Sequence, residues 1–316
     1  MAHLPDLPTP STQQPVDESA LGPACVLSFN ASDPSGAGGL AADISTICAM
    51  GAHPLPVVTS VLLRDTAEVF DAQAIDADCV IEQARSILED VSISACKVGF
   101  LGNAEGVSAA AEILSDYSEA PLVAYWPTLS WMQDDELQQY TDAFRELILP
   151  STQLLVGNLT ALSELLLPEW EAERPPSARE LAVAAAEHGC SYVLVTSMPL
   201  PEHFIDNVLA SPNGAITGER FERFEASFIG AGDTLSAAVT ALLAEGGELH
   251  VAVGEALNFL DQALDAGFRP GMGQVIPDRF FWALPPAEEG AEAGEPGPES
   301  TETAAAPEVK NTKHLH

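Results

Sequence analysis

Two glycine-bearing turns hold the residues of this sequence that could do chemistry. The later turn reads Gly230-Ala231-Gly232-Asp233 and precedes an apolar segment with helical spacing, Leu235–Leu243. Successive small residues at the start of a helix form a nest of N–H donors that can hold a developing phosphoryl charge. The Asp233 carboxylate could accept a proton from an attacking hydroxyl. The alternative is that Asp233 only caps the helix, because aspartate is a preferred N-cap residue.

The earlier turn runs from Asn30 to Gly39, directly after the buried run Cys25–Phe29 and before a second helical segment. Its small residues allow backbone N–H groups to approach a ligand closely, and a helix N-terminus favours polar or anionic groups. No Gly-Lys-Ser or Gly-Lys-Thr follows, and the glycines do not have Gly-x-Gly-x-x-Gly spacing. Taken alone, this turn is equally well explained as a tight strand-to-helix connection.

The elements that must position these turns alternate along the chain. Six apolar runs predict buried strands: Cys25–Phe29, Leu55–Leu63, Ile93–Phe100, Pro121–Tyr125, Gln153–Val156 and Ser191–Thr196. Helical spacing predicts helices over 40–48, 80–88, 180–188 and 235–243, and Ile216–Phe224 predicts a small strand or hairpin. This alternation predicts an α/β fold with right-handed βαβ units and helices on both faces of the sheet. Ligands then bind at the carboxyl ends of the strands, where both turns lie.

Composition predicts three segments. Residues 1–22 are rich in proline, serine and threonine and are expected to form a flexible leader. Residues 286–316 contain almost no large apolar side chain and are expected to form a disordered acidic tail. Between them, residues 23–285 show no internal linker or repeat, which predicts a single domain.

Charge and cysteine content restrict the class of protein. Twelve Lys and Arg stand against 47 Asp and Glu, a formal net charge of −35. So negative a field repels nucleic acid and anionic membranes, and neither is an expected partner. The five cysteines form no Cys-x-x-Cys pair, and the histidines have no ligand spacing, so no protein metal site is predicted. With neither a signal peptide nor a membrane span in the sequence, we expect a cytoplasmic, acidic protein.

The two turns together resemble the ribokinase-like superfamily, whose members carry a Gly-x-Gly-Asp or Gly-x-Gly-Cys anion hole near the C-terminal end. Within it, the segment from Ala31 to Asp43 resembles the opening signature of the hydroxymethylpyrimidine/phosphomethylpyrimidine kinases. The resemblance continues through Lys97-Val98-Gly99 and ends with Gly267–Gln274 and Ile276–Trp282. It spans residues 24–284 and implies a three-layer αβα sandwich with a mostly parallel central sheet.

The resemblance also implies a function. It implies ATP- and Mg²⁺-dependent phosphorylation of the hydroxymethyl group of an aminopyrimidine, and then of its monophosphate, in thiamine biosynthesis. Members of the superfamily are often homodimers. The residues it implicates are Ala31, Asp43, Arg64 and Phe100 for the pyrimidine, Asn158 and Thr196 for ATP, Gly230, Ala231 and Gly232 for the anion hole, and Asp233 for catalysis.

Several positions depart from the family's pattern. Asp233 stands where the family usually has cysteine, whereas sugar and pyridoxal kinases have aspartate at this position. Arg64 stands where a glutamine or glutamate usually contacts the pyrimidine. The acid that helps to organise Mg²⁺ is absent at Ala161, and Thr196 replaces the start of a Lys-Gly-Gly motif. Lys97 is the only lysine before the tail, so no loop lysine can hold phosphates.

These departures leave three functions open: an active pyrimidine kinase, a pyridoxal-type kinase, and a noncatalytic pyrimidine- or nucleotide-binding protein on the same fold. Two tryptophans also have two interpretations. Trp126 and Trp131 could fill space on the ATP side or could stack on a base.

Overall fold

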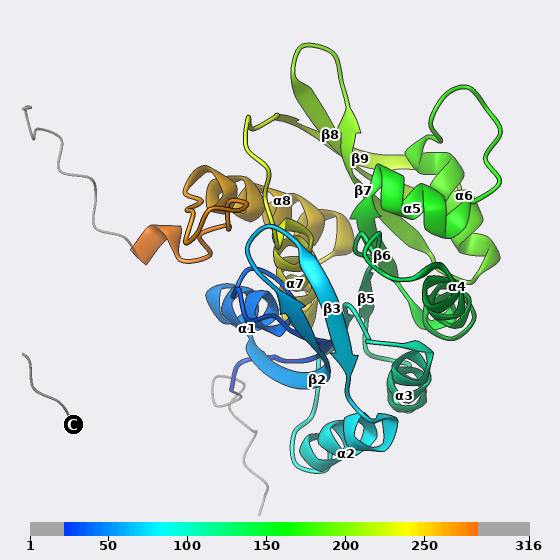
Figure 1. Ribbon diagram of the computed structural model, residues 1–316, viewed down its shortest axis with the longest axis vertical. Helices are drawn as coiled ribbons and strands as arrows, with labels where there is room; N and C mark the ends of the chain where they lie inside the picture. Colours follow the sequence, from blue (N-terminus) through cyan, green and yellow to red (C-terminus); the bar gives the residue numbers. More distant parts are fainter. Residues whose placement is uncertain (1–21, 284–316) are drawn as a thin grey trace, which may run out of the picture. The chain divides into compact units, whose positions relative to one another are not determined.

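The described part of the chain, residues 22–283 of a computed structural model, is built around one twisted sheet. Its nine strands run in the order β3-β2-β1-β4-β5-β6-β7-β8-β9 (Figure 1). Strands β1, β2 and β4 to β7 pair in parallel, whereas β3, β8 and β9 pair antiparallel at the two edges. The strands are β1 Cys25–Ser32, β2 His53–Arg64, β3 Val69–Ala74, β4 Ala95–Val98, β5 Leu122–Tyr125, β6 Leu154–Asn158, β7 Tyr192–Pro199, β8 Phe204–Ser211 and β9 Gly214–Glu222.

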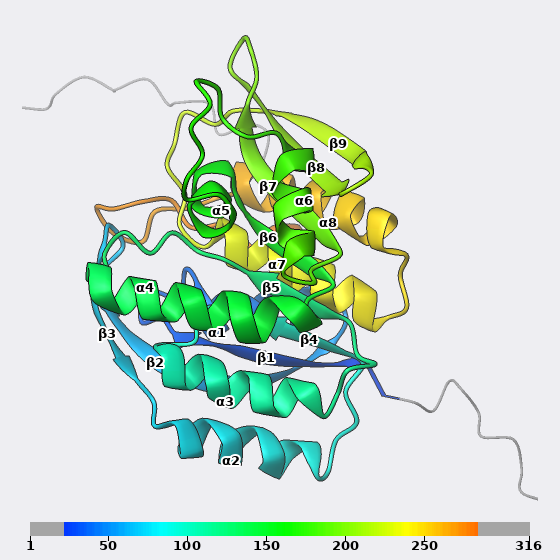
Figure 2. The same cartoon turned by 90° about the vertical axis from the view of Figure 1, so that its right-hand side faces the viewer.

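Helices cover both faces of this sheet (Figure 2). One face carries α1 Gly39–Ala49, α7 Ala231–Ala244 and α8 Leu249–Asp265. The other carries α2 Ala77–Leu88, α3 Ala104–Ser115, α4 Asp134–Ala143, α5 Leu159–Leu166 and α6 Ala178–Glu187. A π-helical turn, Phe144–Ile148, and short 3₁₀ turns at Leu149–Ser151 and Phe281–Ala283 complete the secondary structure of the described residues.

The central strands are buried on both sides, which explains why they appear in the sequence as continuous apolar runs. In β5, Leu122 and Ala124 pack into the core beneath α2 to α6, whereas Val123 packs with Leu235 and Leu257 beneath α7 and α8. Side chains of a strand alternate between its faces, so one short run supplies both cores. The predicted αβα sandwich with a mostly parallel sheet is confirmed.

The six predicted strands and four predicted helices are present, and the late strand is one arm of the β8–β9 hairpin. Contacts divide the chain after Phe281 into two units, and only Trp282 and Ala283 of the second are described. The predicted leader, apart from Gly22, and the predicted tail lie outside the described residues. No helix in 22–283 is long and apolar enough to cross a membrane.

Candidate active site

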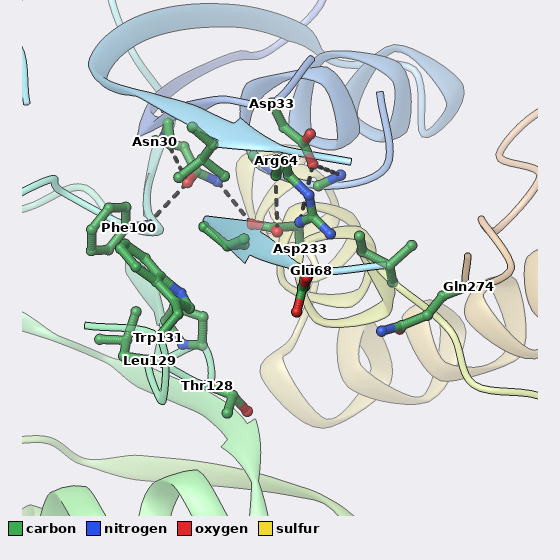
Figure 3. Close-up of a pocket in the computed structure, with 18 of the residues that line it drawn as sticks. Asn30, Asp33, Arg64, Glu68, Phe100, Thr128, Leu129, Trp131, Asp233 and Gln274 are labelled. Carbon is green, nitrogen blue, oxygen red and sulfur yellow. Dashed lines mark hydrogen bonds and ion pairs between the residues drawn. The ribbon is translucent and has the colours of Figure 1, made fainter. Parts of the chain in front are cut away.

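A pocket opens where the carboxyl ends of β1 and β2 meet the start of α7, and we call it the β1–β2 pocket. Its cavity volume is about 360 Å³. Five of the residues implicated by the sequence line it, namely Ala31, Arg64, Phe100, Gly230 and Asp233. Figure 3 shows the side chains of Arg64, Phe100 and Asp233 converging on the cavity from different elements of the fold. The two glycine-bearing turns therefore come together in space.

Three donors from outside its own helix hold the Asp233 carboxylate. Its Oδ1 accepts hydrogen bonds from Nδ2 of Asn30 at 2.8 Å and from Nζ of Lys97 at 3.2 Å. Its Oδ2 accepts from the backbone N–H of Gly39 at 3.1 Å. The N-cap of α7 is Gly230, and no side chain caps this helix. The cap-only interpretation of Asp233 is therefore wrong, and the carboxylate faces the pocket.

Asn30 holds the Asp233 carboxylate in place, because both polar atoms of the Asn30 side chain are themselves hydrogen-bonded within the protein. Its Oδ1 accepts from the backbone N–H groups of Ala31 at 2.9 Å and Phe100 at 3.0 Å, which turns Nδ2 toward Asp233 and Asp43. A Cβ at Gly99 would overlap the Asn30 carboxamide, so only glycine leaves room for it. The register of β1 against β2 shifts between Asn30 and Ala31, at the point where the strand meets the pocket.

Beneath the pocket, Lys97 joins two carboxylates. Its ammonium lies 2.7 Å from Oδ1 of Asp43 and 3.2 Å from Oδ1 of Asp233, and its side chain is fully buried. Burial alone would lower the pKa of Lys97, but the two carboxylates outweigh burial and hold that pKa above its ordinary value. Lys97 therefore carries a positive charge that offsets the negative charges of Asp43 and Asp233 beneath the pocket.

Asp43 is not where the sequence placed it. Its side chain is fully buried and does not line the β1–β2 pocket, because it accepts hydrogen bonds from Ser28 at 2.7 Å and from Asn30 at 2.9 Å and pairs with Lys97. Its expected direct contact with a pyrimidine is therefore wrong for this structure. Asp43 instead acts through Asn30 and Lys97, both of which reach Asp233.

Arg279 ties the two glycine-bearing turns together. It is 6% exposed, and its guanidinium donates to Oγ1 of Thr234 at 2.9 Å and to the carbonyl oxygens of Gly36 and Ala37. Gly230 closes the same junction, with φ +82°, and a Cβ there would collide with the Ala37 carbonyl. No motif spacing connects Arg279 to these partners, so sequence reasoning gave it no role.

The walls of the pocket differ in chemistry (Figure 3). Phe100 and Trp131 form an aromatic wall, with ring centroids 5.4 Å apart in an edge-to-face arrangement. Arg64 is the last residue of β2, and Glu68 comes from the β2–β3 connection. Trp126, by contrast, is 4% exposed and stacks on Tyr140 in the core. One tryptophan thus fills space, and the other lines the β1–β2 pocket.

A second pocket lies on the other side of the α7 N-terminus, and we call it the α7–α8 pocket. Ala231 and Gly232 line it, as does Thr196 of β7. Leu235, Leu257, Leu260 and Leu264 make it largely apolar. Asn158 lines neither pocket: its Oδ1 caps α5 by accepting from Ala161 N–H at 2.9 Å, and its Nδ2 donates to Thr128. The two residues expected to bind ATP are thus neighbours across β6 and β7, but only Thr196 lines the α7–α8 pocket.

Metal-binding potential is limited at this site. Within residues 22–283, no three His, Cys, Asp or Glu side chains are grouped so that they could hold a metal ion. Magnesium does not require such a cage, because it usually binds through one or two carboxylates together with substrate phosphates and water. The lack of such a group within residues 22–283 is therefore compatible with magnesium that binds together with a nucleotide.

Comparison with known proteins identifies the family. The family model for phosphomethylpyrimidine kinase matches residues 33–278, which include most of the earlier turn, the whole later turn, Lys97 and Arg64. The chain belongs to the phosphomethylpyrimidine kinase family. It is accordingly a phosphotransferase with an alcohol group as acceptor.

Curated relatives agree with this assignment. The hydroxymethylpyrimidine/phosphomethylpyrimidine kinase of Streptomyces coelicolor is 30% identical over 264 residues, which cover 83% of this chain and 96% of the relative. The Escherichia coli protein of the same name is 31% identical over 246 residues, which cover 75% of this chain and 90% of the relative. The similarity thus extends over nearly the whole length of both relatives.

Solved structures show the same fold. An ADP complex of Bacillus subtilis pyridoxal kinase superposes with a TM-score of 0.75 at 24% identity, covering 84% of this chain and all of that one. A phosphomethylpyrimidine kinase from Clostridium difficile superposes with a TM-score of 0.63 at 21% identity, covering 76% and 99%. The kinases of both substrate classes therefore share the ribokinase-like architecture of this phosphomethylpyrimidine kinase family member.

Proposed function

We propose that the protein transfers the γ-phosphoryl group of ATP to the hydroxymethyl group of an aminopyrimidine, and then to the resulting monophosphate, in thiamine biosynthesis. One observation supports this proposal: the four consecutive residues at the start of α7 are divided between the two pockets. Gly230 and Asp233 line the β1–β2 pocket, and Ala231 and Gly232 line the α7–α8 pocket. An alcohol on one side and a nucleotide on the other would meet at this turn.

The β1–β2 pocket suits the acceptor. A flat ring would lie against Phe100 and Trp131, with its hydroxymethyl group toward Asp233. In the reaction, the substrate oxygen bonds to the γ-phosphorus as the bond from that phosphorus to the β-phosphate oxygen breaks. The hydroxyl proton passes to the Asp233 carboxylate, which Asn30, Lys97 and Gly39 hold in place.

The α7–α8 pocket suits the nucleotide. Its leucines would pack against the adenine ring, and the first-turn N–H groups of α7, which have no partner within their helix, point toward the junction where phosphate charge develops. Complexes of pyridoxal kinases with ADP and with AMP-PCP support ATP as the donor. Bound Mg²⁺ would neutralise charge on the phosphates, and we assign no residue of this chain to it.

A pyridoxal-type kinase is the second candidate, and Asp233 and the fold neighbours favour it. ATP consumption measured with hydroxymethylpyrimidine, its monophosphate and pyridoxal side by side separates the candidates. We expect turnover with both pyrimidines and a lower kcat/KM with pyridoxal. Higher kcat/KM with pyridoxal would favour the second candidate. No ATP consumption with any of the three, together with measurable pyrimidine binding, would support a noncatalytic binding protein.

A further inference from the structure

Arg64, whose side chain is largely buried, presents hydrogen-bond donors to the β1–β2 pocket. Its side chain is 9% exposed, and it is the only cationic residue among those that line this cavity in the described chain. Its Nε donates to the Asp65 carbonyl at 2.9 Å, which fixes the plane of the guanidinium. Within residues 22–283, neither terminal nitrogen has a hydrogen-bond acceptor, and the nearest carboxylate oxygen, on Asp33, lies 3.6 Å from Nη1.

Asp33 does not supply the missing acceptor, because its Oδ2 lies 3.6 Å from Nη1 of Arg64 and the turn holds both of its oxygens in place. Its Oδ1 accepts from the N–H and the hydroxyl of Ser35, and its Oδ2 accepts from the N–H of Gly38 at 2.8 Å. Arginine has donors only, and the terminal nitrogens of Arg64, which lines the cavity, remain available to an acceptor there. A ligand in the pocket is therefore the source from which the terminal nitrogens of Arg64 gain a partner.

Charge decides what kind of acceptor fits. Asp33, whose side chain is completely buried, already offsets the charge of Arg64, and Glu68 and Asp233 also line the cavity. An anionic ligand group placed at Arg64 would meet the carboxylates of Asp33 and Glu68 in a partly desolvated site, where like charges repel strongly. A neutral acceptor on the ligand avoids this repulsion and still satisfies the N–H groups.

We propose that Arg64 is a specificity-determining residue that selects aromatic rings presenting a neutral acceptor, a ring nitrogen or a carbonyl oxygen, to the end of β2. This inference rests on the proposed function, in which the ring lies against Phe100 and Trp131 with its hydroxymethyl group toward Asp233. A ring amino group, which is a donor, must point away from Arg64. A ring phenolate, as in pyridoxal, is disfavoured because it is anionic.

The test compares the aminopyrimidine alcohol with two analogues in which one ring nitrogen at a time is replaced by C–H. In the natural protein, one analogue should lose about 10- to 100-fold in kcat/KM, mostly through KM, because a hydrogen bond to a charged donor is lost. Arg64→Met should raise KM for the parent alcohol by a similar factor. In that variant, the same analogue should lose nothing further.

Controls separate this role from a structural one. Arg64→Gln retains a donor and should recover part of the KM lost in Arg64→Met. Arg179→Met removes an exposed arginine outside the β1–β2 pocket, which donates a hydrogen bond to the Pro212 carbonyl, and should leave KM unchanged. If Arg64→Met does not fold, the Arg64→Gln variant and the two analogues still measure the effect.

The outcomes are distinct. Normal turnover in Arg64→Met with unchanged KM, or equal activity on the parent and both analogues, would overturn the role of Arg64 and leave the proposed function standing. A higher kcat/KM for pyridoxal than for the aminopyrimidine would overturn the preference for a neutral acceptor. Absence of turnover with every ring alcohol would overturn the proposed function and, with it, this inference.

Discussion

The carboxamide of Asn30 and the carboxylate of Asp233 act as one unit, although 203 residues separate them in the chain. Asn30 touches Asp233 directly and is fixed by two backbone donors. If it acts by holding that carboxylate, Asn30→Ala should lower kcat about tenfold, with a smaller effect on KM. Combined with Asp233→Asn, the same change should lower kcat no further, because coupled residues give non-additive effects.

A matched control distinguishes positioning from general destabilisation. Asn103 caps α3 by accepting from Gly106 N–H at 2.8 Å and does not line the β1–β2 pocket. Asn103→Ala should lower the unfolding free energy by about 1 kcal/mol and leave kcat unchanged in both backgrounds. Additive losses of kcat in the Asn30 and Asp233 double variant would contradict the positioning role.

Among the single residues of the site, the sequence predicted those that lie within a recognisable motif. Asp233 and Gly230 were found because they lie together in a recognisable turn, and Ala31 because it lies in the other. Asn30 and Arg279 received no role because their partners are distant in sequence. Asp43 was misplaced because its motif position says nothing about burial, and only the fold shows that it faces Lys97.

Among the elements, α6 shows a stabilising device that is local in sequence. Ser177 and Glu180 form a reciprocal capping box at its start, and Glu180 also pairs with Arg174 at 2.7 Å. Ser177→Ala should therefore lower the unfolding free energy by about 1 kcal/mol, measured by denaturant titration. Ala184→Gly in the same helix would not be a suitable control, because Ala184 is buried and the change would also remove packing contacts of its side chain.

The same capping box predicts a pH dependence. Hydrogen bonds from Arg174 and Ser177 lower the pKa of Glu180 to about 2, from an ordinary value of 4.5. A depressed carboxyl pKa gives stability that is present above the ordinary value and is lost as the pH falls toward 2. The melting temperature of Glu180→Gln should therefore lie below that of the natural protein at pH 6, and the two should converge near pH 2. As a control, Glu187→Gln, at the other end of α6, should not lower the melting temperature at pH 6 in the way that Glu180→Gln does.

Element prediction succeeded where burial imposes a clear pattern and failed at the edges. The central strands are apolar on both faces, so their runs are visible in the sequence. Strand β3 has no fully buried residue, and its sequence resembles a loop. Helix α8 was missed although Val253, Ala256 and Leu257 recur at helical spacing, so the signal was present. Strand β8 becomes evident only from its pairing with β7 and β9.

For the whole molecule, the net charge of −35 predicts a response to salt. Self-repulsion is screened as the Debye length falls from about 10 Å at 0.1 M salt to about 3 Å at 1 M. We therefore expect the melting temperature to rise with KCl over this range. The same concentrations of sucrose, which does not screen charge, provide the control for a general solute effect. A melting temperature that is lowered by KCl would contradict the prediction.

The two chemical steps of the proposed function place different demands on Asp233. A hydroxymethyl group must lose a proton as it attacks, whereas a phosphate monoester is mostly a dianion at pH 7, since its second pKa is about 6. The carboxylate that accepts a proton is therefore needed for the first step and dispensable for the second. Asn30, Lys97 and Gly39 hold the carboxylate at the junction of the two pockets, where this difference should be visible.

The most direct test of the account measures kcat of Asp233→Asn for both steps, with hydroxymethylpyrimidine and with its monophosphate. Removing a general base costs about 10²- to 10⁴-fold. We predict a loss of this size for the alcohol and a loss of less than about tenfold for the monophosphate, in a variant that circular dichroism shows to be folded. An unchanged kcat for the alcohol, or equal losses in the two steps, would contradict the assignment of Asp233 as the catalytic base.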